Sequence, residues 1–305
     1  MAGISINNPH PINISALIEK ISPNRISAPF LYLSVKRTHK KVNEFCLKKT
    51  GEFARLHFMQ DRLSRMRLMV GEKALKKLKN AHVMVVGCGA VGSYAIEALA
   101  RAGVGRLTLV DFDKVSVTNI NRQLFALSST VGEKKVDVAK ARVLDIAKDI
   151  KVKTLDMMVN AETLSELIKI KPNFVVDAID SLNPKCCLIE ALVNAKIPFV
   201  SSMGAALKTD PIKIQIAKMK KTLNCPLAFF VRKRLRKRGV AMDFPVVYSP
   251  ELTQDKTKLQ LPEEVNQASG RVRHEMGSFP TITGIFGLMC AHVVIQNLTK
   301  EGKDE

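Results

Sequence analysis

Residues 81–113 read AHVMVVGCGAVGSYAIEALARAGVGRLTLVDFD, and they carry the clearest fold signal in the chain. Val83–Val86 is a short apolar run of the kind that forms a buried parallel strand, and it ends in a glycine loop. Ser93–Ala102 has the apolar spacing of a helix and is followed by two glycines that would end it. A second apolar run, Leu107–Val110, stops at Asp111. The stretch therefore predicts one strand–helix–strand unit.

The same alternation continues along the chain. We expect further strands at 153–159, 174–179 and 198–201, and helices at 134–150, 161–170 and 185–195. This order predicts an α/β fold with a doubly wound, mostly parallel, Rossmann-like sheet that carries helices on both faces. Residues 279–298 are long enough to cross a bilayer, but they include polar side chains such as His292 and Gln296, so we expect a C-terminal packing helix and no transmembrane span.

Charge and cysteine usage narrow the function classes. The 305 residues include 48 Lys and Arg against 28 Asp and Glu, a net charge of +20 that favours an anionic partner such as nucleic acid or a membrane surface. The six cysteines form no CxxC pair, so we expect no zinc and a reduced, intracellular protein. Trp is absent and there are three Tyr, which predicts that any nucleic-acid contact is mainly electrostatic.

The first 60 residues differ from the rest in composition. They are rich in Lys, Arg and Ser, with only Glu19, Glu44 and Glu52 as acids. A cleavable organelle presequence has a similar bias, but these acids and the lack of an Arg-rich amphipathic helix favour a loosely ordered basic extension. We therefore expect an extension over 1–60 and one catalytic domain over 61–305.

The glycine loop predicts a nucleotide site. Gly87, Gly89 and Gly92 follow a strand and precede a helix, where backbone N–H groups and the helix dipole bind phosphate. Asp111, at the end of the next strand, is placed to accept hydrogen bonds from ribose hydroxyls. Up to this point an NAD-dependent oxidoreductase fits as well as an ATP-dependent enzyme.

The residues after Asp111 favour ATP. Asn119, Arg122 and Lys135 supply an amide, a guanidinium and an ammonium group, a set suited to a triphosphate whose α-phosphorus is attacked. Asp180, after the strand predicted at 174–179, adds a carboxylate for Mg²⁺. We interpret the set as an adenylation site, with Arg122, Lys135 and Asp180 as the catalytic candidates. The neighbouring Asp113 and Asp177 would serve either the metal or local structure.

Six motifs in order resemble a known family. They are Arg65 within Arg62-Leu-Ser-Arg-Met, Gly87–Ser93, Asp111-Phe-Asp, Thr118-Asn-Ile-Asn-Arg-Gln, Gly132-x-x-Lys135 and Asp177-Ala-Ile-Asp180. Over residues 61–298 the chain resembles the ThiF-type, ubiquitin-activating-like adenylation family. The resemblance implies that Arg65 reaches the γ-phosphate, in the family often from the partner subunit of a homodimer. Whether Arg65 acts within its own subunit or across the dimer stays open at this stage.

Further stretches resemble one branch of that family. Lys220-Lys-Thr-Leu-Asn-Cys-Pro-Leu227 is similar to a segment of the tRNA threonylcarbamoyladenosine dehydratases, in which Cys225 is not needed. The segments 181–185, 202–206, 276–280 and 284–287 resemble that branch too. The resemblance implies ATP-dependent cyclisation of threonylcarbamoyladenosine next to the tRNA anticodon, through adenylation of the threonyl carboxylate. It also implies tRNA as partner, no obligatory protein substrate, and a cytoplasmic or mitochondrion-associated location.

A basic segment fits such a substrate. Lys208–Arg238 contains 11 Lys or Arg against the single acid Asp210. Its densest run is expected to bind tRNA phosphates and consists of Arg232, Lys233, Arg234, Arg236, Lys237 and Arg238. The alternatives are a solvated helix face for this run and, for the whole protein, an adenylating activator of a ubiquitin-like or sulfur-carrier protein, or a non-catalytic tRNA-binding protein.

Overall fold

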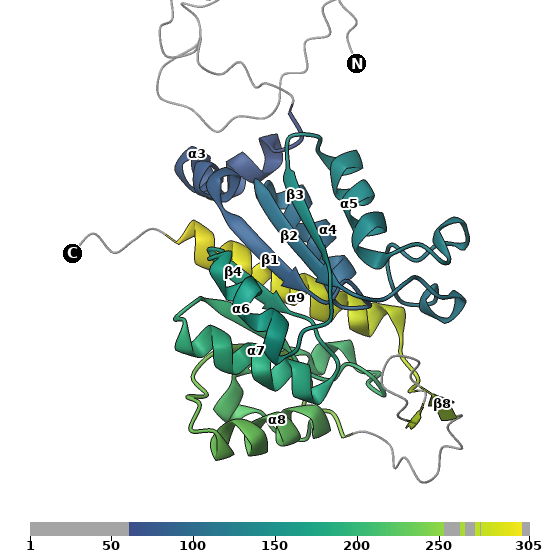
Figure 1. The fold of residues 1–305 in the computed structure, drawn as a ribbon. Coiled ribbons are helices and arrows are strands. Elements are labelled where there is room, and N and C mark those ends of the chain that lie inside the picture. Colours follow the sequence, from purple (N-terminus) through teal and green to yellow (C-terminus); the bar gives the residue numbers. More distant parts are fainter. Residues whose placement is uncertain (1–60, 253–262, 266–271, 275, 301–305) are drawn as a thin grey trace, which may run out of the picture. The chain divides into compact units, whose positions relative to one another are not determined.

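A seven-stranded sheet forms the centre of the computed structural model, which describes residues 61–252, 263–265, 272–274 and 276–300 (Figure 1). Its order is β3-β2-β1-β4-β5-β7-β6, parallel except for β6, which runs antiparallel to β7. The strands are β1 His82–Val86, β2 Arg106–Asp111, β3 Lys151–Asp156, β4 Phe174–Asp177, β5 Phe199–Ser202, β6 Gln215–Lys218 and β7 Pro245–Tyr248. A separate antiparallel pair joins β8 Glu263–Val265 to β9 Val272–His274. The doubly wound, mostly parallel α/β fold is confirmed.

Helices cover both faces of this sheet. They are α3 Ser64–Asn80, α4 Gly92–Ala102, α5 Lys135–Ile146, α6 Ala161–Lys169, α7 Leu182–Asn194, α8 Pro226–Lys237 and α9 Pro280–Thr299. Short 3-10 helices lie at η2 Val117–Asn119, η3 Ser128–Thr130, η4 Pro211–Lys213 and η5 Met219–Lys221. The hydrophobic core beneath α4, α5 and α9 is distinct from the core that α6, α7 and α8 form on the other face.

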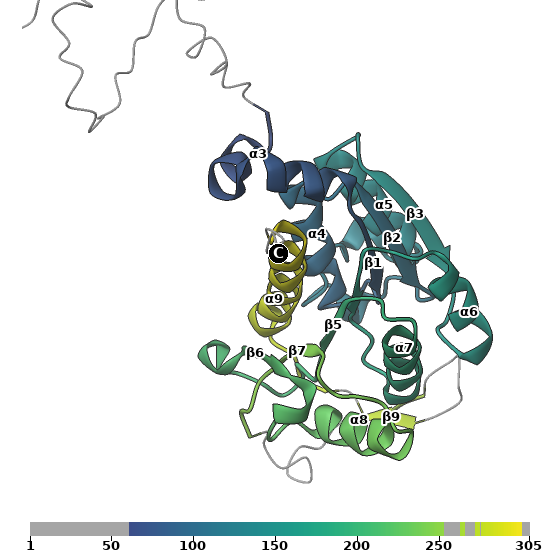
Figure 2. The same ribbon diagram turned by 90° about the vertical axis from the view of Figure 1, so that its left-hand side faces the viewer.

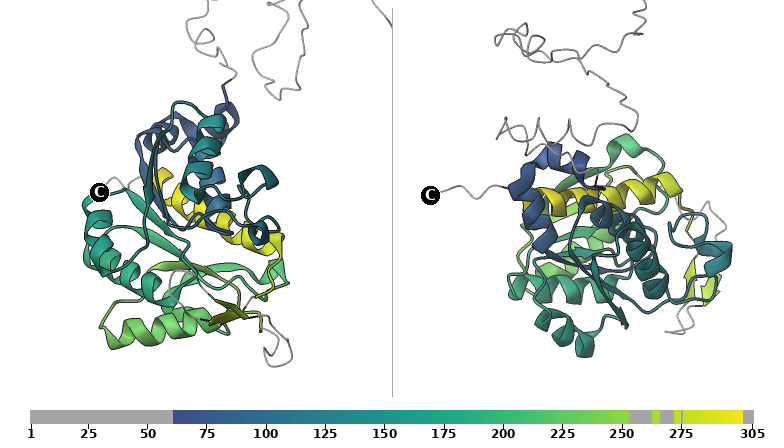
Figure 3. Two further views of the ribbon diagram at one scale, coloured as in Figure 1. Left: turned by 45° about the vertical axis from the view of Figure 1, so that its right-hand side comes forward. Right: turned by 90° about the horizontal axis from the view of Figure 1, so that it is seen from above.

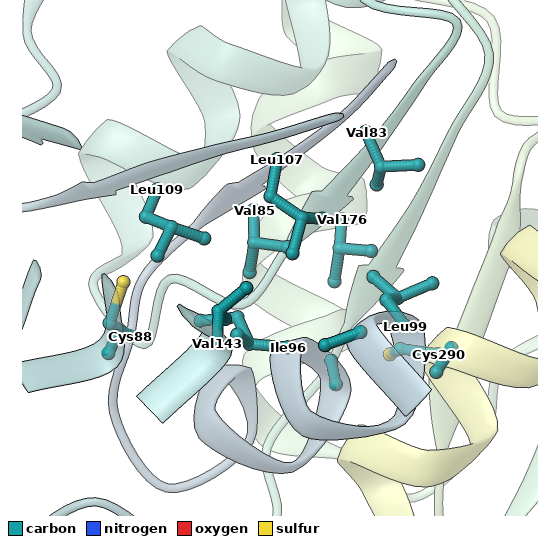
Figure 4. Close-up of a cluster of buried hydrophobic side chains, with 14 of the residues drawn as sticks. Val83, Val85, Cys88, Ile96, Leu99, Leu107, Leu109, Val143, Val176 and Cys290 are labelled. Carbon is teal, nitrogen blue, oxygen red and sulfur yellow. The ribbon is translucent and has the colours of Figure 1, made fainter. Parts of the chain in front are cut away.

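Strand β1 shows why the sheet lies between two helical layers. Val83 and Val85 point into the core shared with α4 and α9, where Figure 4 places them beside Val176 of β4. Met84 and Val86 point into the opposite core. Because successive side chains alternate across a strand, a continuous apolar run is buried on both sides. This explains why the run at 83–86 is a central strand.

Helix α9 packs across α4 and borders the first core (Figures 2 and 3). Its length and a mean hydropathy of 1.5 would also allow a membrane span, and it is the one helix among the described residues with both properties. Gly287 permits the close crossing, because a Cβ there would lie 2.3 Å from the carbonyl oxygen of Val91. The predicted packing helix is therefore confirmed, and it lies against the first turn of α4.

Several boundaries differ from the sequence predictions. Helix α5 ends at Ile146 instead of residue 150, because Ala147 is already extended and the chain enters β3 at Lys151. Helix α7 begins three residues earlier than predicted, at Leu182. The antiparallel edge pair β6–β7 and helix α3, which is kinked at Gly71, are additions that the strand–helix alternation did not indicate. Residues 1–60 lie outside the described residues, so the proposed boundary at 61 stays a prediction.

Candidate active site

The predicted nucleotide loop lies where the strand order of the sheet reverses. From β1 the chain winds outward to β2 and β3, and it then returns to place β4 on the other side of β1. The loops after β1 and β4 therefore face each other at the carboxyl edge, the usual ligand position of this fold. Ala178 N, just past β4, donates to Val86 O at the end of β1 over 2.8 Å. The two loops that carry the predicted site are thus joined directly.

The backbone of the protein requires glycine at two of the three loop positions but not at the third. Gly87 has φ +95°, and a Cβ there would lie 2.8 Å from Ala178 O. A Cβ on Gly92 would lie 1.7 Å from Gly87 O, so the protein's own backbone excludes a side chain at either position. At Gly89 the nearest atom, Nε2 of the buried Gln123, would be 3.7 Å away, which is an ordinary contact. Gly89 therefore leaves room that the protein itself does not fill, in front of the N-terminus of α4.

Asp111 lies beside this loop at the end of β2. Its Oδ2 accepts from Cys88 N over 2.7 Å, and its Oδ1 accepts from Asp113 N over 2.9 Å. Burial raises the pKa of the Asp111 carboxyl, and the positive charge of Lys135 opposes that rise. A carboxylate has about four acceptor positions. Two of them hold the loop in place, and the others can accept hydroxyl groups.

Lys135 is held at the start of α5 by an ion pair. Its Nζ lies 2.7 Å from Asp113 Oδ2, and its backbone N donates to Asp113 O over 3.0 Å. The Lys135 side chain is 9% exposed, whereas that of Asp113 is 48% exposed. Asp113 therefore orients the buried ammonium group from the solvent side. Of the two roles left open for Asp113, the structure supports the local one.

Asn119 and Arg122 lie on the segment that follows β2. Asn119 is buried, and its Oδ1 accepts from Ser116 N over 3.2 Å. The half-buried Arg122 donates through Nη1 to Thr118 O over 2.8 Å and to Asn121 Oδ1 over 2.9 Å.

This segment is tied to the glycine loop by a residue that sequence reasoning missed. Ser93, fully buried in the first turn of α4, accepts from Leu124 N over 3.1 Å. Gln123 is also buried, next to Gly89. Both belong to the quoted motifs, and only their burial in the fold distinguishes them from the neighbouring residues.

Asp180 and Asp177 have opposite environments. Asp180 is exposed in the loop after β4, and its Oδ1 accepts from Ser181 Oγ over 3.1 Å. Asp177 is completely buried, where its Oδ2 is 2.7 Å from Lys185 Nζ and 2.6 Å from Ser201 Oγ. A buried carboxylate with these partners serves the structure, so a metal role for Asp177 finds no support.

The donor set fits Mg²⁺ held jointly with a nucleotide. The described residues contain no group of three or more His, Cys, Asp or Glu side chains that would enclose a metal. Mg²⁺ is commonly bound through one or two carboxylates together with phosphate oxygens and water. One exposed carboxylate, Asp180, at the same edge as the glycine loop satisfies that requirement.

Arg65 lies in the first turn of α3, near the C-terminal end of α4, whereas the glycine loop precedes the N-terminal end of α4. Leu63, two residues earlier, lies against Gly103 at the C-terminal end of α4, and Arg62 donates to Ala100 O there. Helix α4 has eleven residues, which is about 16 Å, and the glycine loop lies at its other end. Arg65 itself is exposed.

The predicted tRNA-binding residues all lie on α8 or at its C-terminal end, but they differ in what they contact. Arg232 donates to Thr222 Oγ1, and Arg238 forms a 2.7 Å ion pair with Glu190. Arg234 is half-buried. Lys233, Arg236 and Lys237 are exposed and form no ion pair within the part of the chain that the structure describes. Three of the six cations are therefore available to an anion.

Comparison with known proteins identifies the family. A model of the ThiF family matches residues 61–305. The chain belongs to the ThiF family. It is 41% identical over 245 residues to the tRNA threonylcarbamoyladenosine dehydratase of Bacillus subtilis, covering 79% of this chain and 96% of the relative. It is 42% identical over 179 residues to the Escherichia coli enzyme of the same name, covering 59% of this chain and 65% of the relative.

A solved structure agrees with the placement in the ThiF family. The E. coli tRNA N6-threonylcarbamoyladenosine dehydratase in complex with ATP aligns with a TM-score of 0.69 at 33% identity, covering 78% of this chain and 93% of that chain. The resemblance inferred from the six motifs is confirmed. The roles of individual residues are not tested by these likenesses, so they remain predictions.

The described cysteines in the site have structural positions. Cys88 is buried inside the glycine loop, and burial together with the charge of Asp111 raises the pKa of its thiol well above 9.0. Cys225 is buried at the N-terminal end of α8. Neither position presents a sulfur atom to solvent for covalent chemistry.

Proposed function

We propose that this chain catalyses the ATP-dependent dehydration of threonylcarbamoyladenosine in tRNA to its cyclic form. The observation that carries the proposal is the 41% identity that extends over 96% of a tRNA threonylcarbamoyladenosine dehydratase. The geometry supports the proposal, because the loops after β1, β2 and β4, which carry the residues predicted to bind ATP, lie at one edge of the sheet.

Different residues of the site would bind different parts of ATP. The α4 N-terminus and Gly89 receive phosphate, and Asp111 accepts the ribose hydroxyls. Lys135, Arg122 and Asn119 stabilise the charge that develops on the α-phosphate. Mg²⁺ would be held by Asp180 and would supply additional charge neutralisation. Asp113 keeps the Lys135 ammonium oriented until a phosphate shares it.

The reaction proceeds in two displacements. A threonyl carboxylate oxygen attacks the α-phosphorus, forming an acyl-adenylate and releasing pyrophosphate. The carbamoyl group of the same nucleoside then attacks the acyl carbon and loses a proton, and AMP leaves as the ring closes. The nucleoside loses the elements of one water molecule. No enzyme nucleophile is needed, because both reacting groups belong to one modification and proximity drives the closure.

The tRNA would approach over α8. Lys233, Arg236 and Lys237 supply unpaired positive charge there, and the net charge of +20 attracts the polyanion from a distance. The solvated-face alternative predicts that removal of these charges leaves tRNA affinity unchanged.

We also propose a homodimer in which Arg65 acts across the interface. Leu63, two residues before Arg65, lies against Gly103 at the end of α4 opposite the glycine loop, which supports action of Arg65 across the interface. Leu68 and Met69 follow Arg65 on α3 and are 69% and 83% exposed. An exposed apolar segment beside Arg65 is suited to contact with a second copy.

For location we propose the cytoplasm, because the cysteines among the described residues are unpaired and mostly buried. The alternative, mitochondrial association, would depend on residues 1–60. Fractionation of cells that express the full chain or a variant without 1–60 separates the two: only an organelle pool that disappears with the deletion contradicts the proposal.

The decisive test is the reaction itself. Purified full-length protein is incubated with ATP, Mg²⁺ and tRNA that carries threonylcarbamoyladenosine, and the nucleosides are analysed by mass spectrometry. We expect loss of one water from that nucleoside, with AMP formed in equal amount, and an unchanged rate in Cys225→Ser. ATP–pyrophosphate exchange that requires a small carrier protein, without loss of water, would instead support the carrier-activating alternative. Binding of tRNA without AMP formation would support the non-catalytic one.

A further inference from the structure

Two phenylalanines stand out on the surface of α8. Phe229 and Phe230 are 53% and 50% exposed. Their ring centroids are 5.3 Å apart with an interplanar angle of 77°, an edge-to-face pair. The buried face of the same helix is formed by Ala228, Val231 and Leu235, so the two aromatic rings are not needed to attach α8 to the protein.

The sequence around this pair carries positive charge and no negative charge. Between Asp210 and Asp243 the chain contains no acidic residue. Residues three and four apart are neighbours on a helix surface, which places Lys233 one turn beyond both rings. Arg236 and Lys237 continue the same exposed face. An aromatic pair at one end of a helix is thus followed by cations that no described acid neutralises.

The helix begins at the edge of the sheet that carries the candidate active site. Leu227 Cβ and Cys225 Sγ lie within 3.5 and 3.7 Å of a Cβ built on Gly204, which follows the carboxyl end of β5. Strand β5 is the direct neighbour of β4, with Asp177 opposite Ser201. The aromatic end of α8 is therefore the end nearer the loop that carries Asp180.

We infer that Phe229 and Phe230 form a stacking platform for unpaired bases of the anticodon loop, while the cations that follow them on α8 hold its phosphates. This rests on the proposed tRNA substrate. Every base has a π face, so exposed aromatic rings beside a basic groove bind single-stranded RNA through stacking and charge together. The sequence-based expectation of mainly electrostatic binding is refined accordingly: two adjacent phenylalanines suffice where Trp and Tyr are scarce.

Stacking and charge differ in salt dependence, which makes them separable. Removing a phosphate contact lowers the slope of log affinity against log salt by about 1, whereas removing a ring leaves the slope unchanged. Two double variants of the full chain are compared, Phe229→Ala/Phe230→Ala and Lys233→Ala/Arg236→Ala. The probes are a fluorescently labelled anticodon stem-loop hairpin and a blunt RNA duplex of equal length, measured by anisotropy across a KCl series.

We expect the phenylalanine variant to lose on the order of 10-fold affinity for the hairpin at every salt concentration, with an unchanged slope and unchanged duplex binding. The cation variant should lower the slope by about 1 to 2 and weaken both probes. Phe230→Trp should retain hairpin affinity, because a larger ring still stacks. Unchanged ATP binding shows that each variant is folded.

Three outcomes would overturn the platform. The first is that the phenylalanine variant loses equal affinity for hairpin and duplex, or loses affinity for neither. The second is that light scattering shows a changed oligomeric state in this variant, which would mean that the two rings contact a second copy of the chain. The third is that wild type binds anionic vesicles and that only the phenylalanine variant loses this binding.

The platform and the proposed reaction can fail separately. If dehydration fails while the phenylalanine variant still loses hairpin affinity, the proposed reaction is wrong and the platform stands. If the protein dehydrates the nucleoside but the phenylalanine variant keeps its hairpin affinity, the proposed reaction stands and only the stacking platform is wrong.

Discussion

Asp177 and Lys185 form an ion pair of 2.7 Å in which both side chains are completely excluded from solvent. Ser201, opposite Asp177 on the neighbouring strand, donates to the same carboxylate oxygen and lies 3.2 Å from the Lys185 ammonium. The other oxygen, Oδ1, accepts from Ile179 N over 3.1 Å. The pair thereby anchors the start of the loop that ends at Asp180. A buried charge network is thus connected through the backbone to the candidate metal ligand.

Breaking this pair should destabilise the protein severely. In Lys185→Met the Asp177 carboxylate is left buried without its counter-charge, and we expect the free energy of unfolding to fall by about 3–5 kcal/mol in urea denaturation. A matched control is Lys218→Met at the exposed pair with Asp243, which should change stability little. A Lys185→Met protein as stable as wild type would contradict a stabilising role for this pair.

The loop glycines offer a second matched comparison. Gly92→Ala places a Cβ against Gly87 O and should cost about 3 kcal/mol or more, whereas Gly89→Ala should leave the unfolding free energy within about 0.5 kcal/mol of wild type. Gly89→Ala should nevertheless lose ATP affinity by about 10-fold or more in calorimetric titration, because its Cβ occupies the phosphate approach. Wild-type ATP affinity in Gly89→Ala would show that the phosphate does not bind beside Gly89.

Lys135 and its neighbour Lys134 should behave differently. Lys135→Ala removes the ammonium group beside Asp113 and should lower kcat for cyclisation by on the order of 10²–10³-fold. Lys134 pairs with Asp156 at the surface, so Lys134→Ala, with the same loss of charge, should keep the wild-type rate. Rates come from single-turnover AMP formation. Equal effects of the two substitutions on kcat would show that Lys135 contributes only through the net charge of the protein.

The position of Arg65 predicts complementation between two inactive variants. Arg65→Ala and Lys135→Ala should each be inactive alone. When they are mixed under exchange conditions, a heterodimer gains one complete site, and about one quarter of wild-type AMP formation should return. No recovery, despite subunit exchange shown by native mass spectrometry, would contradict action across the interface.

Thiol reactivity should follow burial. Burial raises the pKa of Cys290 to about 12 and that of Cys88 well above 9.0, so at pH 8 only about one thiol in 10⁴ at Cys290 is ionised. Both should resist iodoacetamide in the folded protein. Cys187 is partly exposed beside the Arg238 guanidinium, 3.6 Å from Nη1, and should be alkylated first among these three. Peptide mass spectrometry after timed quenching gives the order, and early labelling of Cys88 would indicate that the glycine loop opens.

Much of the fold was predictable because its signals are local. The apolar run at 83–86, the helix spacing from 93 to 102 and the glycines between them lie within one short stretch, so period and spacing identify them. The order of six motifs then indicated the family, which the match over 61–305 confirmed. The end of α5 and the start of α7 were misplaced because extended and helical backbone compete there, and packing of the completed sheet decides the boundary.

From the sequence alone, a nucleotide loop after β1 could be predicted, and so could the positive charge that accumulates around α8. Which of those charges is available depends on the folded chain, because Arg232 donates to Thr222 and Arg238 pairs with Glu190, and both partners lie on other elements. The same holds for the Asp177–Lys185 pair, which Ser201 joins from a neighbouring strand. It also holds for Arg65, since the chain just before it packs at the end of α4 opposite the glycine loop. Such relationships are formed by residues distant along the chain, and no local pattern of hydrophobicity or motif spacing encodes them.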